Sequence, residues 1–314
     1  MVSSMSSNDP SDTHPTRAPG EGKPRPGSPQ PGGAPLSPGL YVVSTPIGNL
    51  RDVTLRALDV LAGADEVLAE DTRTARKLLD AYSIRARVSP YHDHNGATRR
   101  PELLEKLNDG AAIALISDAG TPLVSDPGFK LVRDVAAAGH PVLPIPGASA
   151  LLAGLVVAGL PSDRFLFAGF LAPKSTARRR ELQDLSAIPA TIVFYETGPR
   201  LASTLADMAE VLGPGRNACV ARELTKLFEE ARRGTLDSLA DHYGEAGGPK
   251  GEIVILIGPP EATHASAADL DAALLSALKS MPTKQAANSV AEALGIPKRE
   301  AYQRALALKT DGPA

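Results

Sequence analysis

The residues from Ile116 to Gly128, ISDAGTPLVSDPG, decide how the fold of this chain is read. The apolar run that leads into them, Ala112 to Ile116, is typical of a short buried strand, and the small and polar residues that follow are typical of a loop. Asp126 and Pro127 then fit the N-cap and first position of a helix that continues to Gly139. In open parallel sheets, ligands bind beyond the carboxyl ends of the strands. We therefore expect this loop to hold a small molecule.

Two further loops have the same character. Ser44 to Leu50, STPIGNL, follows the apolar run Leu40 to Val43, and Pro144 to Ser149, PIPGAS, follows Val142 and Leu143. Asp, Gly, Thr and Pro also make ordinary tight turns, so one such loop alone does not indicate a site. Three strand ends with similar loops favour a shared binding edge.

Composition limits the classes of protein that the chain can be. It has 314 residues, of which 43% are apolar, and this is enough for two or three domains with cores. A net charge of −3 argues against coating nucleic acid by bulk attraction, so contact with RNA requires a local basic patch. One cysteine, Cys219, excludes an internal disulfide framework. No run approaches the ~20 apolar residues of a membrane helix, so we expect a cytoplasmic protein without a membrane span.

The pattern along the chain predicts four parts. Residues 1–38 are rich in Ser, Pro and Gly and indicate a disordered tail. Residues 39–160 alternate strands and helices, which predicts an N-terminal α/β domain with a parallel sheet. Residues 161–260 predict a C-terminal α/β domain whose shorter connections indicate a mixed sheet. Residues 261–314 predict helices, with 284–294 and 298–308 spaced like a helix-turn-helix, although a helical hairpin packed on a partner subunit fits the same pattern.

Several kinds of chemistry have no support in the sequence. There is no Walker-type phosphate loop and no Gly-x-Gly-x-x-Gly, so the usual nucleotide and dinucleotide sites are not indicated. The histidines lack partners at the spacing of a zinc site, so we expect no metal. No Gly-x-Ser-x-Gly elbow is present, which argues against covalent catalysis. What remains is chemistry by positioning, with a cofactor held by backbone and small side chains.

Seven ordered motifs between about Leu40 and Gly258 carry a resemblance to a known family. They are Tyr41–Leu50, Glu70–Arg73, His92–Asn95, Ser117–Gly128, Gly159–Phe165, Phe194–Glu196 and Arg222–Lys226. Together they resemble the ribosomal RNA small subunit methyltransferase I family of the tetrapyrrole methylase superfamily. The resemblance implies two α/β domains with S-adenosylmethionine in the cleft between them, and a homodimer. It also implies 2′-O-methylation of a cytidine in the decoding centre of 16S rRNA in the small ribosomal subunit, at rRNA position 1402.

Carried over position by position, the resemblance assigns cofactor binding to the three loops. The residues are Pro46, Ile47 and Gly48; Ser117, Asp118, Ala119, Gly120, Thr121 and Pro122; and Pro146, Gly147 and Ala148. Ala148 departs from the family, in which proline is common at that position. The exchange frees one φ angle and returns one N–H, so the shape of this loop can differ locally.

Methyl transfer to a ribose hydroxyl requires alignment of donor and acceptor, and a carboxylate in reach could take the hydroxyl proton. The carboxylate candidates are Glu70, Asp71, Glu196 and Glu223, and the sequence does not choose among them. Asp71 also fits a helix cap, and Glu223 also fits an ion pair with Arg222 or Lys226. Candidates for stacking on a base are His92 and Tyr195. Candidates for substrate phosphates are Arg73, Lys174, Arg178, Arg179, Arg200, Arg222 and Lys226.

Three functions compete at this point. An RNA 2′-O-methyltransferase leads, because the basic helical stretch near Lys174 and the helical carboxyl-terminal region favour RNA. A tetrapyrrole C-methyltransferase of the same superfamily would need an apolar cleft that binds acids. A non-enzymatic RNA-binding or assembly module would keep the cofactor loop without using it.

Overall fold

A computed structural model describes residues 35–260 and 267–310. Most of the predicted disordered tail, residues 1–34, lies outside the described residues. The chain divides into two compact units. The first contains the residues up to Leu185 together with Ala190–Gly258, and the second contains Ser186–Pro189 and the residues from Pro259 onward.

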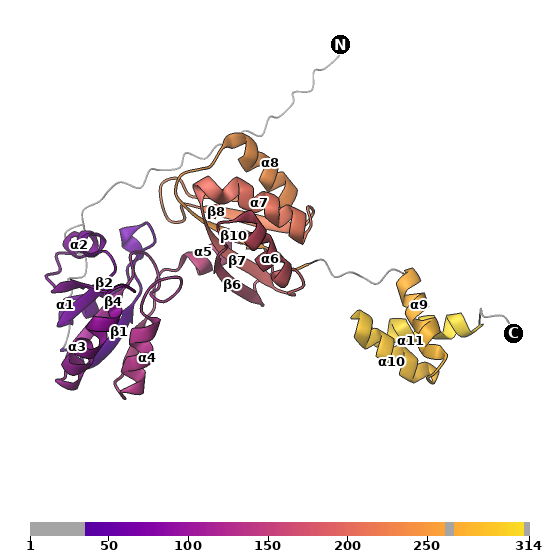
Figure 1. Ribbon diagram of the computed structural model, residues 1–314, viewed down its shortest axis with the longest axis horizontal. Helices are drawn as coiled ribbons and strands as arrows, with labels where there is room; N and C mark the ends of the chain where they lie inside the picture. The colour runs from indigo at the N-terminus through magenta and orange to yellow at the C-terminus, as the bar shows by residue number, and fades with distance from the viewer. Residues whose placement is uncertain (1–34, 261–266, 311–314) are drawn as a thin grey trace, which may run out of the picture. The chain divides into compact units, whose positions relative to one another are not determined.

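The first unit begins with a five-stranded parallel sheet, as the alternation of strands and helices predicted. Its order is β3-β2-β4-β1-β5, and every neighbouring pair is parallel. The strands are β1 (Gly39–Val43), β2 (Glu66–Ala69), β3 (Val88–Pro90), β4 (Ala112–Ile116) and β5 (Val142–Ile145). The connecting elements are η1 (Leu50–Asp52), α1 (Leu55–Gly63), α2 (Thr72–Ala81), α3 (Gly96–Asn108) and α4 (Phe129–Ala137) (Figure 1). Because β4, β1 and β5 are neighbours, the three small-residue loops leave the same edge of the sheet.

Helices cover both faces of this sheet. Along β4, Ala112, Ala114 and Ile116 belong to one buried cluster with α1 and α2. Ile113 and Leu115 belong to a second cluster with α3 and α4. Side chains alternate between the faces of a strand, so a strand buried on both sides is continuously apolar. This is why β4 is recognisable in the sequence.

The start of α4 differs from the sequence prediction. The helix begins at Phe129, after Gly128, so the assignment of Asp126 as its N-cap and Pro127 as its first residue was wrong. Leu123 and Ser125 have φ values of 72° and 61°, and Gly128 has a φ of 130°. Three residues with positive φ keep the chain turning until Gly128, where an added Cβ would lie 2.8 Å from a methyl carbon of Leu115. Asp126 is thereby left in the loop.

The first unit continues through α5 (Ala150–Ala158) into a second five-stranded sheet of order β6-β7-β10-β8-β9. Its strands are β6 (Phe165–Phe170), β7 (Thr191–Thr197), β8 (Asn217–Arg222), β9 (Glu230–Thr235) and β10 (Glu252–Ile257). Only β6 and β7 pair in parallel, so the expectation of a mixed sheet is confirmed. Its helices are α6 (Ser175–Leu185), α7 (Gly198–Leu212) and α8 (Leu236–Ala246) (Figure 1). Cys219 is buried within β8, where α5 packs on the sheet.

The second unit contains three helices around a core of their own. They are α9 (Ala267–Leu278), α10 (Thr283–Leu294) and α11 (Lys298–Thr310). Leu274, Ala287 and Ala301 are among the fully buried residues of this core. Gly295 ends α10 in the left-handed conformation, and both helices that the sequence predicted here are present. Within the described ranges, no helix is long and apolar enough to span a membrane.

Candidate functional site

Hydrogen bonds lock the loops after β1 and β4 side by side. The N–H of Thr45 donates to the carbonyl of Gly120 at 2.8 Å, and the N–H of Gly120 donates back to Thr45 at 3.1 Å. The hydroxyl of Ser117 also donates to the Gly120 carbonyl, at 3.0 Å. These contacts fix the shape of the central loop before any ligand is considered.

The loop after β5 is attached to the same centre through Thr121. Its hydroxyl donates to the carbonyl of Ala148 at 3.2 Å and lies 3.1 Å from the hydroxyl of Ser44. At Gly147, an added Cβ would lie 2.9 Å from the Cβ of Ser44. Gly120 has a φ of 83°, which favours glycine, and a Cβ there would lie 3.1 Å from Ile47. Small residues are therefore required for the three loops to meet.

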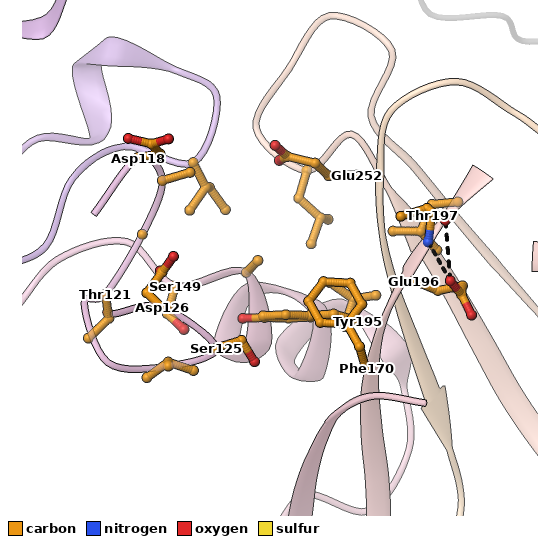
Figure 2. A pocket seen from close by; sticks show the side chains of 18 of the residues that line it. Asp118, Thr121, Ser125, Asp126, Ser149, Phe170, Tyr195, Glu196, Thr197 and Glu252 are labelled. Atoms are coloured by element: carbon orange, nitrogen blue, oxygen red, sulfur yellow. Dashed lines mark hydrogen bonds between the residues drawn. The ribbon is translucent and has the colours of Figure 1, made fainter. Parts of the chain in front are cut away.

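A cavity of about 320 Å³ opens beside the central loop (Figure 2). The first sheet contributes Ile47 and the loop from Asp118 to Asp126, apart from Pro122 and Leu123. The second sheet contributes Phe170, Tyr195 and the residues from Gly251 to Val254. The volume lies in the range of about 300–1,000 Å³ that small-molecule sites occupy. The walls are mainly apolar, and both sheets contribute polar groups to them.

A second cavity of about 460 Å³ is also lined by residues of this loop. It is lined by Pro46, Gly48 and Ser117, by Thr74 and Lys77 of α2, and by Lys226. Four residues line both cavities, namely Ile47, Asp118, Ala119 and Glu252. The two cavities therefore adjoin each other at these residues.

The structure brings most of the predicted cofactor residues to these cavities, but not all of them. Pro46, Ile47, Gly48, Ser117, Asp118, Ala119, Gly120 and Thr121 line one cavity or both. Pro122, Pro146, Gly147 and Ala148 line neither, and Ser149 and Ala150 reach the first cavity instead. The third loop thus reaches the first cavity at Ser149 and is attached to the central loop at Ala148.

Glu196, one of the four predicted carboxylates, is held by its own strand and by α7. It is buried, and its carboxylate accepts hydrogen bonds from the Thr197 N–H and the Thr204 hydroxyl, both at 2.7 Å. Arg200 lies 3.3 Å from the same carboxylate. Figure 2 shows Glu196 turned toward Thr197, away from the loop that carries Asp118. This arrangement suits a structural ion pair.

Asp71 and Glu223 are also engaged. Asp71 caps α2, as the sequence indicated, and hydrogen bonds from Arg73 hold the pKa of its carboxyl at about 2. The backbone N–H of Asp71 donates to Asp118 at 3.0 Å. Glu223 pairs with the ammonium of Lys226 at 2.8 Å. Burial alone would raise the pKa of Glu223, but Lys226 and the N–H of Glu252 outweigh burial and lower it.

Glu70 and Asp126 have no hydrogen bond or ion pair with any residue that the structure describes. Burial, Asp118 and Asp93 raise the pKa of Glu70. Burial, Glu70 and Asp118 raise the pKa of Asp126 to about 6. Asp126 lines the first cavity and was missed as a site residue, because Asp followed by Pro also fits a helix start. The only sequence signal for it was its place within the central motif.

The predicted substrate-binding residues are divided between the cavities and the rest of the first unit. Lys226 lines the second cavity and Tyr195 the first, where the Tyr195 hydroxyl accepts from the Leu151 N–H at 3.2 Å. Arg73 is 87% exposed and pairs with Asp71. Lys174 is exposed immediately before α6, and His92 makes an edge contact with His94. Arg200 and Arg222 instead bind the Leu171 carbonyl and Glu230 respectively, and line neither cavity. Arg178 and Arg179 both pair with Asp207 and also line neither cavity.

A contact between the two sheets' loops closes one side of the second cavity. The N–H of Asn49 donates to the hydroxyl of Thr225 at 3.1 Å, and Gly48 lies directly against Lys226. Glu223 and Thr225 have φ values of 51° and 66°, which are uncommon for residues other than glycine. The ammonium of Lys226 pairs with Glu223 and also lies 3.2 Å from the carboxylate of Glu252.

In the part of the chain that the structure describes, no group of three His, Cys, Asp or Glu residues could hold a metal ion.

Comparison with known proteins identifies the family. Residues 39–240 match the family described as Tetrapyrrole (Corrin/Porphyrin) Methylases, and residues 264–309 match the RsmI C-terminal HTH domain. A protein of Mesorhizobium japonicum named ribosomal RNA small subunit methyltransferase I is 54% identical over 88% of this chain and 94% of its own length. The chain belongs to the ribosomal RNA small subunit methyltransferase I family. The resemblance that the seven motifs indicated is confirmed.

Other members of this ribosomal RNA small subunit methyltransferase I family match over the same extent. The protein of that name from Erythrobacter litoralis is 52% identical over 88% of this chain and 97% of its own length. Among solved structures, a cobalt precorrin-4 methyltransferase aligns with a TM-score of 0.53 at 19% identity, over 70% of this chain and 94% of its own. A diphthine synthase aligns with a TM-score of 0.53 at 14% identity, over 70% of this chain and 89% of its own. These likenesses show a shared fold, in which each of two sheets packs against its own helices.

Proposed function

We propose that this protein uses S-adenosylmethionine to methylate the 2′-hydroxyl of a cytidine in 16S rRNA of the small ribosomal subunit. The relatives named as small-subunit rRNA methyltransferases support the substrate class. The observation that carries the proposal is the pair of adjoining cavities that share Ile47, Asp118, Ala119 and Glu252. A group transfer needs donor and acceptor in adjoining sites with their reacting atoms aligned. Such a protein would work in the cytoplasm, where small subunits are assembled.

We assign the donor to the first cavity. Ile47, Leu224 and Val254 offer apolar surface for an adenine ring, and the loop from Asp118 to Thr121 lines the same cavity and offers polar groups to a nucleoside. When bound there, S-adenosylmethionine supplies an activated methyl group, whose bond to sulfur breaks as the new carbon–oxygen bond forms. The carboxylates of this cavity suit the positive charge of the sulfonium.

We assign the RNA to the second cavity. Lys77 and Lys226 line it and can contact phosphate oxygens, and the loop from Pro46 to Gly48 forms its floor. The pairing of Lys226 with Glu223 and Glu252 holds its ammonium at the boundary with the first cavity. Contact with phosphates on this side would place the ribose beside the donor.

The proton of the ribose hydroxyl requires an acceptor near this boundary. Of the four carboxylates predicted from the sequence, Asp71, Glu196 and Glu223 are held by hydrogen bonds or ion pairs. Glu70 has none of these among the described residues, and its raised pKa favours taking up a proton. Glu70 lines neither cavity, but it lies close enough to Asp118, which lines both, for that carboxylate to raise its pKa. We therefore propose Glu70 as the acceptor.

Isotope transfer tests the function. The full-length protein is incubated with methyl-labelled S-adenosylmethionine and either small ribosomal subunits, naked 16S rRNA or a free tetrapyrrole. Label in RNA that resists alkaline cleavage at one cytidine supports the proposal, because a 2′-O-methyl group blocks attack by the neighbouring hydroxyl. Label in the tetrapyrrole alone favours the C-methyltransferase, and label in none of the three favours a binding module.

A homodimer is part of this proposal. Leu152 and Val156 lie one helical turn apart on α5 and are 51% and 84% exposed, while Gly154, Leu155 and Ala158 are buried. An apolar helical face of this kind is typical of an interface with a second copy. Light scattering should give twice the mass of one chain, and Val156→Glu should shift the protein to monomer. A wild-type protein that is monomeric at all concentrations would contradict this part of the proposal.

A further inference from the structure

Every charged side chain that lines the first cavity is acidic. The lining contains Asp118, Asp126, Glu196 and Glu252, and no Lys, Arg or His among the described residues. Arg200 compensates the buried carboxylate of Glu196 from behind. Glu252 pairs with Lys226 of the second cavity, so Asp118 and Asp126 are the two carboxylates of the first cavity that have no ion pair with a described residue.

Among these four carboxylates, Asp126 is the one whose charge no described residue compensates by a hydrogen bond or an ion pair. It is half-buried in the loop, and no described residue donates a hydrogen bond to it or pairs with it. Figure 2 shows it beside Ser149, on the side of the cavity toward which the hydroxyl of Tyr195 points. A carboxylate that is partly removed from water without a partner is costly in free energy, and a cationic ligand would remove that cost.

We infer that Asp126 makes the first cavity selective for the methyl donor, whose sulfur is positively charged, over the product that remains after transfer, whose sulfur is uncharged. The inference rests on the proposed function and deepens it. S-adenosylmethionine has a sulfonium, and S-adenosylhomocysteine has an uncharged thioether in its place, while the rest of the two molecules is the same. An acidic wall therefore stabilises the donor more than the product, which assists release of the product after each turnover.

The protonation state of Asp126 controls this selectivity. The titratable groups that interact with Asp126 are Glu70 after β2, Asp118 after β4 and Tyr195 on β7. Glu252 on β10 lines the same cavity and pairs with Lys226. Burial, Glu70 and Asp118 raise the pKa of Asp126 to about 6, so its charge is lost as the pH falls from 7 to 5. A bound cation stabilises the charged form and lowers that pKa. Donor binding must therefore weaken in acid, and product binding must change less.

Calorimetry on the full-length protein tests the inference without measuring catalysis. The ligands are S-adenosylmethionine, S-adenosylhomocysteine and sinefungin, an analogue in which an amine replaces the sulfonium. Asp126→Asn should weaken the two cationic ligands about tenfold at pH 7.5 and the homocysteine compound less than threefold. In the wild type, the preference for cations should diminish between pH 7 and pH 5. Asp184→Asn is the matched control, since Asp184 is exposed on α6 and lines neither cavity.

The outcomes separate the inference from the function it rests on. Equal losses for all three ligands in Asp126→Asn, or no change in any of them, overturn the inference, because selectivity then does not depend on this charge. A wild type that binds none of the three overturns the proposed donor site itself. Retained binding of S-adenosylhomocysteine by Asp126→Asn shows that the variant is folded, so its preference can be read directly.

Discussion

At the scale of single residues, Gly48 shows why the loops of this site are built from small residues. Its backbone does not have a positive φ, so glycine is not required there for conformation. What excludes a side chain is space, since an added Cβ would lie 2.4 Å from the Cγ of Lys226 and 2.9 Å from the hydroxyl of Thr225. The close approach keeps the Asn49 N–H within 3.1 Å of that hydroxyl.

Gly48→Ala should therefore separate the loops after β1 and β8. We expect a loss of about 1–3 kcal/mol in the free energy of unfolding, the usual cost of overpacking, and a reduced rate of RNA methylation because Lys226 is displaced. Urea denaturation and methyl transfer to small subunits measure the two effects. Gly215→Ala is the control, because nothing lies within 4 Å of the Cβ it would add. Equal stability and activity in both variants would show that Lys226 adjusts without cost.

Residue type alone predicted the roles of some residues correctly and the roles of others wrongly. Asp71 fits a helix cap in the sequence and is a cap in the structure, because capping depends only on neighbours in the chain. Asp126 fits a cap equally well and lines a cavity instead, since the positive φ values at Leu123 and Ser125 delay the helix. Which of the carboxylates remain free was not predictable either, because their partners come from other elements.

At the scale of elements, apolar patterning decided which strands could be predicted. β4 is apolar over its whole length, and its bounds, Ala112–Ile116, are those that the sequence predicted. β9, with the sequence EARRGT, was missed because it is a charged edge strand that pairs only with β8. The conformation of such an edge strand is set by backbone hydrogen bonds to its neighbour. Its sequence therefore lacks the pattern of apolar residues that would predict a strand.

The attachment of α3 to the first sheet depends on Glu66 at the start of β2. Its side chain is 3% exposed and accepts hydrogen bonds from Lys106 at 2.7 Å and Arg99 at 2.8 Å, and one from Ser89. Burial alone would raise the pKa of Glu66, but Lys106, Ser89 and Arg99 outweigh burial and hold it at about 2, below the ordinary 4.5. The charged form of Glu66 is therefore more stable in the folded protein than in the unfolded chain.

Glu66→Gln should lower the free energy of unfolding at pH 7 by about 3 kcal/mol, the amount that corresponds to this pKa difference. A depressed folded-state pKa contributes stability above the unfolded value and loses it as pH falls. The difference between wild type and variant should therefore be full above pH 4.5 and shrink as the pH falls toward 2. Urea denaturation at pH 7 and pH 3 measures it.

Glu102→Gln provides the matched control for that experiment. Glu102 binds the same two cations, Arg99 and Lys106, but its side chain is 45% exposed. Exposed ion pairs contribute about 0–1 kcal/mol, so this variant should stay close to wild type. Equal losses in the two variants would mean that the number of ion pairs, and not the burial of Glu66, stabilises α3.

At the scale of the whole molecule, the two cavities belong to one compact unit, and the last three helices form another unit with a core of its own. All residues that line the two cavities belong to the first unit. Leu270, Leu274 and Val290 belong to a cluster made only of residues from the last three helices. A boundary after residue 260 was predicted, because residues 261–314 indicate helices alone.

Ending the chain after Gly258 should therefore leave donor affinity within about twofold of wild type, because no cavity residue is removed. Affinity for 16S rRNA should fall about tenfold or more, and its dependence on salt should become weaker, if α11 supplies phosphate contacts. Lys298 and Arg299 are exposed at the start of that helix, so full-length protein with both changed to Glu should show the same loss. Calorimetry measures the donor, and filter binding at several salt concentrations measures the RNA. Truncated protein that binds RNA like wild type would assign recognition to the first unit, with Lys77 and Lys226 as its principal cations.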